Sequence, residues 1–169
     1  TGAAIWTGPC DAGYHCRGGA TVPNPPDSLC PLYHYCPSGT ANPQVCNPGK
    51  YTNVTGSVEC LWCPGGYVCD QNSQIKLCPT GHYCPASTPE APITTGVLLQ
   101  YACPKGTYNP YEGLSSENCT QCPGGKYCGK IGLSKPTDNI SAGFYSKYGA
   151  TVASPMDEFA EEGIQGICP

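Results

Sequence analysis

Cysteine recurs in this chain at one short spacing, and that spacing limits what the chain can fold into. The loop "CPGGKYC" at 122–128 nearly repeats "CPGGYVC" at 63–69, with five residues between the two cysteines. The 169 residues include 15 Cys, 22 Gly and 19 Pro, but only 2 Phe, 2 Trp and 1 Met. This composition is typical of a small disulfide-rich scaffold, because too few large apolar side chains remain for an ordinary core.

Short and wide cysteine loops alternate along the chain. The wide loops are "CNPGKYTNVTGSVEC" at 46–60 and "CPKGTYNPYEGLSSENC" at 103–119. Two short loops and one wide loop follow one another twice, which predicts tandem modules. We expect a linker at 1–9, cysteine-rich modules at 10–62 and 63–121, and an incomplete third module at 122–169. The short loops begin and end at Cys10 and Cys16, Cys30 and Cys36, Cys63 and Cys69, Cys78 and Cys84, and Cys122 and Cys128.

The residues inside the loops favour tight turns. Glycine stands three places after the first cysteine in most of them, and it permits the positive φ that a sharp reversal needs. Proline often follows the cysteine and stiffens the entry, and the aromatic residue that comes next is expected to cover the neighbouring bridge. The loop "CPLYHYC" at 30–36 has Tyr33 in the glycine position, so we expect it to turn differently.

The cysteine content also predicts the compartment. Disulfides at this density persist in an oxidising space, so the chain is expected outside the cell or at its surface. Sequons at Asn53, Asn118 and Asn139 agree and predict N-glycans. The Pro-, Ser- and Thr-rich stretch 84–96 is either a flexible loop or a site of O-glycans.

The charge and hydropathy exclude two classes of partner. A net charge of −4 with 12% charged residues argues against nucleic acid, which needs a basic face. The sequence contains no run of about twenty apolar residues, so no membrane span is expected in this segment.

Catalytic and metal readings are weak. The C-x2-C pairs at 60–63 and 119–122 could be halves of a zinc ribbon or redox pairs, but other cysteines crowd the stretch between them and no βαβ pattern surrounds them. His15, His34 and His82 lie in short loops without a placed second ligand, so we interpret them as polar residues on solvated loops. Hydrolase motifs are absent. We therefore expect no enzyme activity, no cofactor and no metal.

One segment is predicted to be helical. In "SPMDEFAEEG" at 154–163, Ser154 can cap, Pro155 suits the first turn, the acids favour the N-terminal end and Gly163 stops the helix. The acids could bind calcium, but EF-hand spacing is missing and a solvated helix is the better interpretation. We expect at most this one short helix, near 155–162, beside a few short β-hairpins.

Two longer strings carry a family resemblance. "CNPGKYTNVTGSVECLWCPGGYVC" at 46–69 and "CPKGTYNPYEGLSSENCTQCPGGKYC" at 103–128 resemble the ephrin-receptor-like cysteine-rich (GCC2/GCC3) repeat. The resemblance covers roughly residues 30–128, while 1–29 fit loosely and 129–167 do not fit. It implies EGF-like or TNF-receptor-like modules in an elongated rod that act as spacers and interaction modules, with no catalytic residues.

The pairing of the cysteines is open on the residues alone, because six cysteines allow fifteen connectivities. Two short pairs and a wide loop are similar to the order in EGF-like modules, which pair first with third, second with fourth and fifth with sixth. Cys128 is then left over: either the chain continues past Pro169, or Cys128 bonds a neighbouring subunit. The bridges implied by this resemblance are Cys10–Cys30, Cys16–Cys36, Cys46–Cys60, Cys63–Cys78, Cys69–Cys84, Cys103–Cys119 and Cys122–Cys168.

These features predict a segment of an extracellular structural glycoprotein. It would belong to a cell-surface stalk or an extracellular filament such as a flagellar hair or matrix fibre, with other modules or copies of itself as partners. The alternative is the ligand-binding ectodomain of a receptor. Further copies of the unit and regular assembly would favour the first, and a flanking transmembrane helix and kinase the second.

Overall fold

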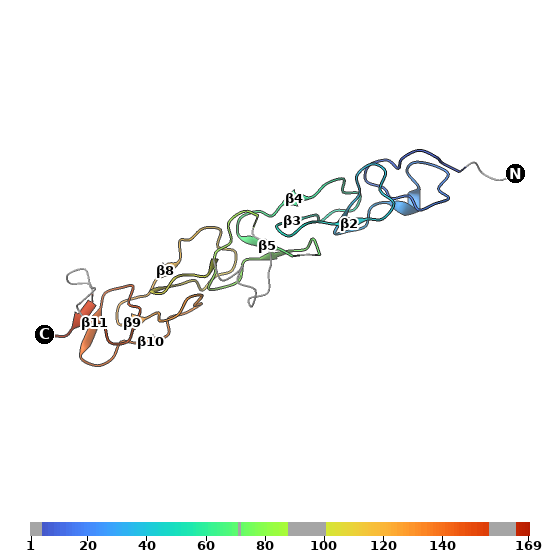
Figure 1. Ribbon diagram of the computed structural model, residues 1–169. Helices are drawn as coiled ribbons and strands as arrows, with labels where there is room; N and C mark the ends of the chain where they lie inside the picture. The colour runs from blue at the N-terminus through green and yellow to red at the C-terminus, as the bar shows by residue number, and fades with distance from the viewer. Residues whose placement is uncertain (1–4, 71, 88–100, 156–164) are drawn as a thin grey trace. The chain divides into compact units, whose positions relative to one another are not determined.

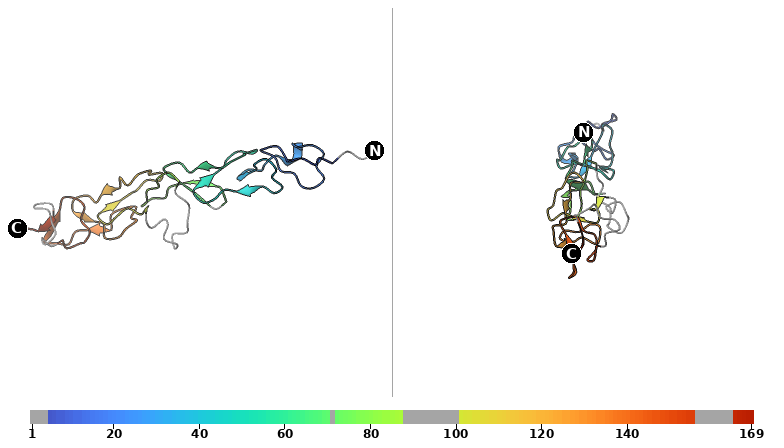
Figure 2. Two further views of the ribbon diagram at one scale, coloured as in Figure 1. Left: turned by 45° about the horizontal axis from the view of Figure 1, so that its top comes forward. Right: turned by 90° about the vertical axis from the view of Figure 1, so that its left-hand side faces the viewer.

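The computed structural model describes residues 5–70, 72–87, 101–155 and 165–169. Over these residues it is a small disulfide-rich protein with short β-hairpins and a single-turn 3-10 helix, η1 (Pro26–Ser28). Figures 1 and 2 show short strand arrows joined by long loops, with no packed helices in the described part. The predicted fold class is confirmed at this level. The helix predicted near 155–162 falls almost wholly on residues outside the described ranges.

The described residues group into two compact units. The first contains residues 5–64, 68–70, 72–76 and 87, and the second contains residues 65–67, 77–86, 101–155 and 165–169. The division into three modules that the sequence suggests stays a prediction.

The sheets are two-stranded and pair strands that are neighbours in sequence: β1 with β2, β3 with β4, β5 with β6, β7 with β8, β9 with β10 and β11 with β12. Where the register is defined it is antiparallel, as in Lys50 opposite Trp62 and Tyr145 opposite Gly166. The strands are β1 (His34–Tyr35), β2 (Gln44–Val45), β3 (Lys50–Tyr51), β4 (Leu61–Trp62), β5 (Tyr67–Cys69), β6 (Ile75–Leu77), β7 (Thr107–Tyr108), β8 (Thr120–Gln121), β9 (Lys126–Tyr127), β10 (Asp138–Asn139), β11 (Phe144–Ser146) and β12 (Gln165–Ile167).

One seven-residue segment, which we call a turn loop, recurs eight times among the described residues. Its fourth residue has φ between 65° and 88°. In seven of the eight, the N–H of the fifth residue donates to the carbonyl of the second, over 3.1–3.3 Å. This is a four-residue turn with positive φ at its third position, which glycine adopts at little cost. The turn loops are residues 10–16, 30–36, 46–52, 63–69, 78–84, 103–109, 122–128 and 140–146.

The turn loop explains the hairpins. The residues just after its turn form the first strand or bridge, and they pair with the residues just before the next turn loop. Lys50–Tyr51 pairs in this way with Leu61–Trp62, and Tyr14 with Leu29. Each repeat therefore consists of one turn loop and one hairpin.

Tyr33 does not change the turn of its loop, so that prediction is wrong. Its φ is 65°, in the same left-handed region as the glycines of the other loops. The N–H of His34 donates to the carbonyl of Pro31 over 3.2 Å, as in the other loops. A side chain in this region costs about 1–2 kcal/mol, and the loop makes the turn despite that cost.

The repeat also continues into 129–167, where the sequence resemblance fails. Ile140 and Ser146 stand where the cysteines stand in other turn loops, and Gly143 between them has φ 88°. The N–H of Phe144 donates to the carbonyl of Ser141 over 3.2 Å. The backbone of the turn loop therefore persists without its cysteines.

The disulfides close single loops, with Cα–Cα distances of 5.8–5.9 Å that suit a bridge. The two wide-loop bridges, Cys46–Cys60 and Cys103–Cys119, are those the resemblance implied. The short loops instead pair within themselves, because the positive-φ turn folds each one back until its two ends meet. They form Cys10–Cys16, Cys30–Cys36, Cys63–Cys69, Cys78–Cys84 and Cys122–Cys128.

Five pairings implied by the EGF-like order are therefore wrong: Cys10–Cys30, Cys16–Cys36, Cys63–Cys78, Cys69–Cys84 and Cys122–Cys168. Cys128 has a mate, and Cys168 is free and exposed. Successive loops meet through their backbones rather than through sulfur.

The backbone contacts between repeats come from a second turn, three or four residues after a turn loop ends. There a residue with φ between 69° and 81°, which we call a clasp residue, donates its N–H over 2.6–2.9 Å. The acceptor is the carbonyl of the first cysteine, not of the loop that has just ended, but of the turn loop before it. The clasp residues and their acceptors are Gly39 and Cys10, Gly56 and Cys30, and Ser87 and Cys63 in the first unit, and Gly113 and Cys78, Gly132 and Cys103, and Gly149 and Cys122 in the second.

In four of these contacts, those around Gly13, Gly66, Gly81 and Gly106, four hydrogen bonds form a set that we call a joint. In the joint of Gly106, its N–H donates to Cys128 and its carbonyl accepts from Cys122, over 2.9 and 2.8 Å. The clasp residue Gly149 donates to Cys122, and Cys128 donates to Ala150, both over 2.8 Å. A Cβ on Gly106 would lie 2.6 Å from the Gly149 carbonyl oxygen, so the joint admits no side chain there.

Buried polar residues replace the second cysteine in the turn loops of the wide loops. Thr52 stands six places after Cys46 and is 2% exposed, and Asn109 stands six places after Cys103 and is 3% exposed. The Asn109 Nδ2 donates to the carbonyl of His82 in the preceding turn loop over 2.9 Å. Because Thr52 and Asn109 cannot form bridges, the cysteines of these loops pair further along the chain.

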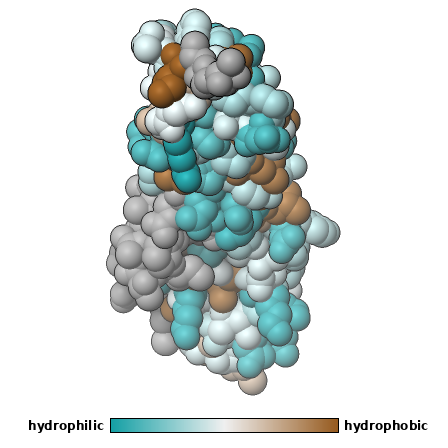
Figure 3. Space-filling view, turned by 90° about the vertical axis from the view of Figure 1, so that its right-hand side faces the viewer, coloured by the Kyte–Doolittle hydropathy of each residue, from teal (hydrophilic) through white to brown (hydrophobic). Residues whose placement is uncertain are grey.

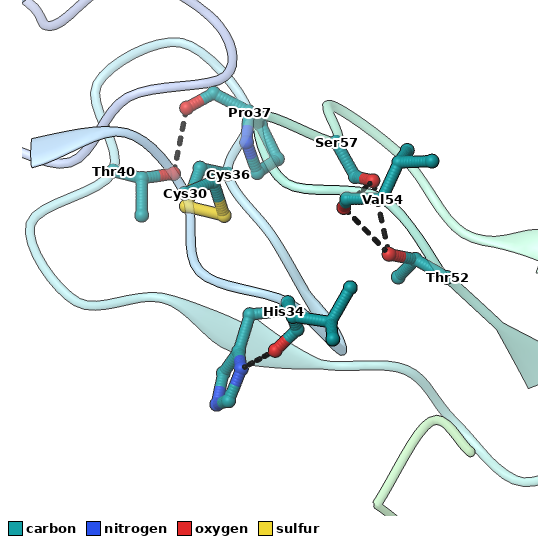
Figure 4. The surroundings of a disulfide bond; sticks show 9 residues. Cys30, His34, Cys36, Pro37, Thr40, Thr52, Val54 and Ser57 are labelled. Carbon is teal, nitrogen blue, oxygen red and sulfur yellow. Dashed lines mark hydrogen bonds between the residues drawn. A yellow bond between two sulfur atoms is a disulfide. The ribbon is translucent and has the colours of Figure 1, made fainter.

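The buried interior is built mainly from cysteine. Cys30, Cys36, Cys63 and eight further half-cystines are almost fully covered, whereas the other buried apolar residues described are few, such as Val68 and Ala150. Figure 4 shows the Cys30–Cys36 bridge among short polar side chains, where the Ser57 Oγ donates to the Val54 carbonyl over 2.8 Å. The expectation that cysteines take the place of an apolar core is confirmed.

Candidate modification sites and interaction surface

The three sequon asparagines are exposed. Asn53 follows Thr52 in the hairpin that the Cys46–Cys60 bridge encloses. Asn118 precedes the bridged Cys119, and its Nδ2 donates to the Ser116 Oγ over 3.2 Å. Asn139 lies in β10 with Lys126 of β9 as its register partner. Each side chain is open to solvent, so the folded chain leaves room for a glycan at all three positions.

The C-x2-C motifs are neither zinc half-sites nor redox pairs. In 60–63, Cys60 is bridged to Cys46 and Cys63 is bridged to Cys69. In 119–122, the two cysteines likewise belong to different bridges. A disulfide sulfur has no thiolate to offer a metal or a substrate. Over the described ranges, no group of three or more His, Cys, Asp and Glu side chains could hold a metal ion.

The three histidines are half-buried and stay local. His34 and His82 occupy the same place in their turn loops, and each ring Nδ1 lies 3.0 Å from the carbonyl two residues earlier, that of Leu32 or Thr80. The Nδ1 of His15 is buried without a hydrogen-bond partner. The rings of His34 and His82 therefore contact the backbone of their own loops.

Apolar side chains are exposed on the hairpin of residues 50–62. We call Val54, Val58, Leu61 and Trp62 the hairpin surface; their exposed fractions run from 47% to 66%. The Lys50 Nζ lies 4.0 Å from the centre of the Trp62 ring, a cation–π contact that orients the indole. Figure 3 shows that apolar atoms, in brown, lie at the surface among polar ones on the face it presents. An open hollow lined by residues 37–44 lies elsewhere in the same unit.

Sequence reasoning missed three features of the repeat: the turn loop 140–146, the clasp residues, and the roles of Thr52 and Asn109. Counting six places from Cys46 and Cys103 would have found Thr52 and Asn109. The glycine, aromatic and spacing of "ISAGFYS" at 140–146 were the available signal for the first. Five of the six clasp residues are glycines, which was the available signal for the second, and only Ser87 departs from that pattern.

Comparison with protein-family models and with curated proteins gives no match. The described part of the chain contains no helix of the length and hydropathy needed to cross a membrane.

Proposed function

We propose that this chain is a segment of an extracellular structural glycoprotein, in which tandem disulfide-stapled repeats form an elongated part of a cell-surface stalk or of an extracellular filament. The observation that carries the proposal is the run of seven bridges in repeated loops, with cysteine as the buried interior. Bridges at this density persist in an oxidising compartment. The chain is built to keep a shape without an apolar core.

The resemblance to the ephrin-receptor-like repeat supports the same role, since such repeats act as spacers and interaction modules. Its EGF-like pairing order does not carry over to the short loops. The proposed partners are other modules or copies of this chain, and the proposed modification is N-glycosylation at Asn53, Asn118 and Asn139, whose side chains are exposed. O-glycans on 84–96 belong to the same proposal.

The second candidate is the ectodomain of a receptor. The hairpin surface favours it, because Leu61 and Trp62 are 51% and 66% exposed. Large aromatic side chains of this kind are common anchors in protein interfaces. Binding of a soluble protein ligand to the native material, lost on Trp62→Ala, would support this candidate over the structural one.

The test uses native material. Intact cells are treated with protease, and the released peptides are alkylated before reduction and mapped by mass spectrometry. We expect release from intact cells, a bridged Cys63–Cys69 peptide, and conversion of Asn53 to Asp by a glycosidase that cleaves N-glycans. Cysteines of the seven bridges that are alkylated without reduction, in a chain that only cell lysis releases, would overturn the proposal.

A further inference from the structure

The bridges follow one another along the chain without interlacing. The Cys78–Cys84 bridge closes before Cys103–Cys119 begins, and that one closes before Cys122–Cys128 begins. Each bridge encloses only the 6, 14 or 16 residue steps of its own loop. No described bridge ties one turn loop to another, so no covalent bond other than the backbone sets the distance between repeats.

Backbone hydrogen bonds hold the repeats together instead. The joint of Gly13 has the same four bonds as that of Gly106: Gly13 donates to Cys36 and accepts from Cys30, Gly56 donates to Cys30, and Cys36 donates to Ser57, all over 2.8–2.9 Å. The buried residues are mostly cysteines within loops, so little apolar surface reinforces a joint. A joint is therefore much weaker than the disulfides on either side of it.

We propose that the chain is an extensible element with a covalent limit: under tension the joints open and the repeats separate, while every disulfide-closed loop stays intact. The EGF-like pairing would forbid this between the two short loops of a module, because its interlaced bridges would tie those two loops together. That the chain carries tension in its native setting rests on the structural role proposed above. That its joints open before its bridged loops does not depend on that role.

Reversibility follows from the same construction. An opened joint leaves the cysteine-containing loops bridged, so the hydrogen-bonding groups inside those loops keep their local geometry. Only the linker between two turn loops, such as residues 129–139, must close again. Loops of about ten residues close in roughly 10–100 ns, so relaxation is expected to restore the joints quickly.

The experiment stretches the whole chain between terminal handles in an optical trap, in a Cys168→Ser background that removes the free thiol. Without reductant we expect lengthening in several small steps that retrace on relaxation. With reductant, each short bridge should release a further extension of about 15 Å and each wide one about 45 Å, from roughly 3.3–3.6 Å per residue less the bridged distance. Gly106→Ala should lower the force of one step, whereas Gly125→Ala, whose Cβ meets nothing within 4 Å, should lower it less.

Two results would overturn the inference. One is a chain that does not lengthen until reductant is added, which would mean that covalent bonds tie the repeats together. The other is a single cooperative extension to the full length allowed by the bridges, which would mean that the joints do not open separately. Both readings come from the oxidised chain without a glycine substitution, so they stand even if Gly106→Ala fails to fold. An intracellular, thiol-rich native protein would defeat the proposed function but would leave the trap result unchanged.

Discussion

The turn loops 122–128 and 140–146 lie in the same unit and make the same turn, but only the first has a disulfide. Gly125 and Gly143 have φ 75° and 88°. The first residue of each loop donates its N–H to the glycine carbonyl of the loop before it: Cys122 to Gly106 over 2.8 Å, and Ile140 to Gly125 over 2.9 Å. The glycine and the hydrogen bonds set the conformation of the loop. The bridge acts mainly by reducing the entropy of the unfolded chain, by about 2 kcal/mol for a loop this short.

The cysteine-free loop lacks that stabilisation and has a second weakness. The Ser146 Oγ is buried and has no hydrogen-bond partner. A buried polar group without a partner costs about 1–3 kcal/mol. Residues 140–146 should therefore open more readily than 122–128, and amide hydrogen exchange at Phe144 and Lys126 would measure the difference.

Reducing all the bridges should have the largest effect on stability, because it removes the difference between the bridged turn loops and 140–146. At about 2–4 kcal/mol each, the bridges together match or exceed the roughly 5–15 kcal/mol by which domains are stable. We expect the reduced, alkylated chain to lose its amide chemical-shift dispersion in NMR spectra, while alkylation without reduction leaves it. Retained dispersion after reduction would show that the hydrogen bonds seen in 140–146 suffice for every loop.

Gly106→Ala should be next, because it strains the turn and breaks a joint. The alanine would have to adopt the φ of 83° that Gly106 has, and its Cβ would lie 2.6 Å from the Gly149 carbonyl oxygen. We expect a loss of about 3 kcal/mol in the free energy of unfolding, from the left-handed strain and the weakened hydrogen bonds.

Gly125→Ala is the matched control, with φ 75° and no atom within 4 Å of its Cβ. It should lose only the about 1–2 kcal/mol of left-handed strain. The free energy of unfolding of the two variants is measured by denaturant unfolding. Equal losses would show that the joint of Gly106 does not contribute to stability.

Moving a bridge between the two loops tests their equivalence directly. Ile140→Cys/Ser146→Cys should close an eighth bridge, seen as the loss of two hydrogens by mass spectrometry, and raise stability by about 2 kcal/mol. Cys122→Ser/Cys128→Ser should lower it by a similar amount and leave the backbone of 122–128 in place. If the two introduced cysteines stayed reduced under oxidising conditions, the two loops would not share one geometry.

The wide loops can be converted to short ones. Asn109→Cys/Cys119→Ser should pair Cys103 with the new cysteine at 109, and Thr52→Cys/Cys60→Ser should do the same for Cys46. We expect the first to cost about 1 kcal/mol more, because it removes the hydrogen bond from Asn109 to the His82 carbonyl in the preceding loop, whereas Thr52 bonds only within its own hairpin. Disulfide mapping and thermal unfolding give both results. A scrambled mixture would show that a cysteine six positions after the first one does not by itself direct the pairing.

The smallest effect should come from Tyr33→Gly. Glycine relieves the strain of φ 65°, but it adds entropy to the unfolded chain and loses the ring, so a gain of up to about 1 kcal/mol is expected. Tyr35→Gly in β1, where the backbone is extended, is the control and should lower the melting temperature. A loss at both positions would mean that the tyrosine ring, rather than the backbone, decides at 33.

The residues predicted the turns better than the pairing. The glycine pattern predicted tight reversals at Gly66 and Gly125, because a turn that needs positive φ favours glycine at that position. The same spacing allowed several connectivities, and the family analogy then chose wrongly for the short loops. Tyr33 misled because a side chain disfavours positive φ by only about 1–2 kcal/mol and does not prevent it. The candidate sites divide in the same way. The sequons predicted glycans at three asparagines, and the structure leaves those side chains exposed. No sequence pattern predicted the hairpin surface.

Composition and spacing alone determined that cysteine would form the interior and that tight turns would recur, because so few large apolar side chains are available. Tertiary structure alone decided which cysteines pair and which residues are clasp residues. It also showed that residues 140–146 form a turn loop without cysteines. The physical reason is that a joint is made of backbone N–H and carbonyl groups. Every residue but proline carries both, so the glycine pattern shows where the chain turns but not which N–H and carbonyl groups will meet.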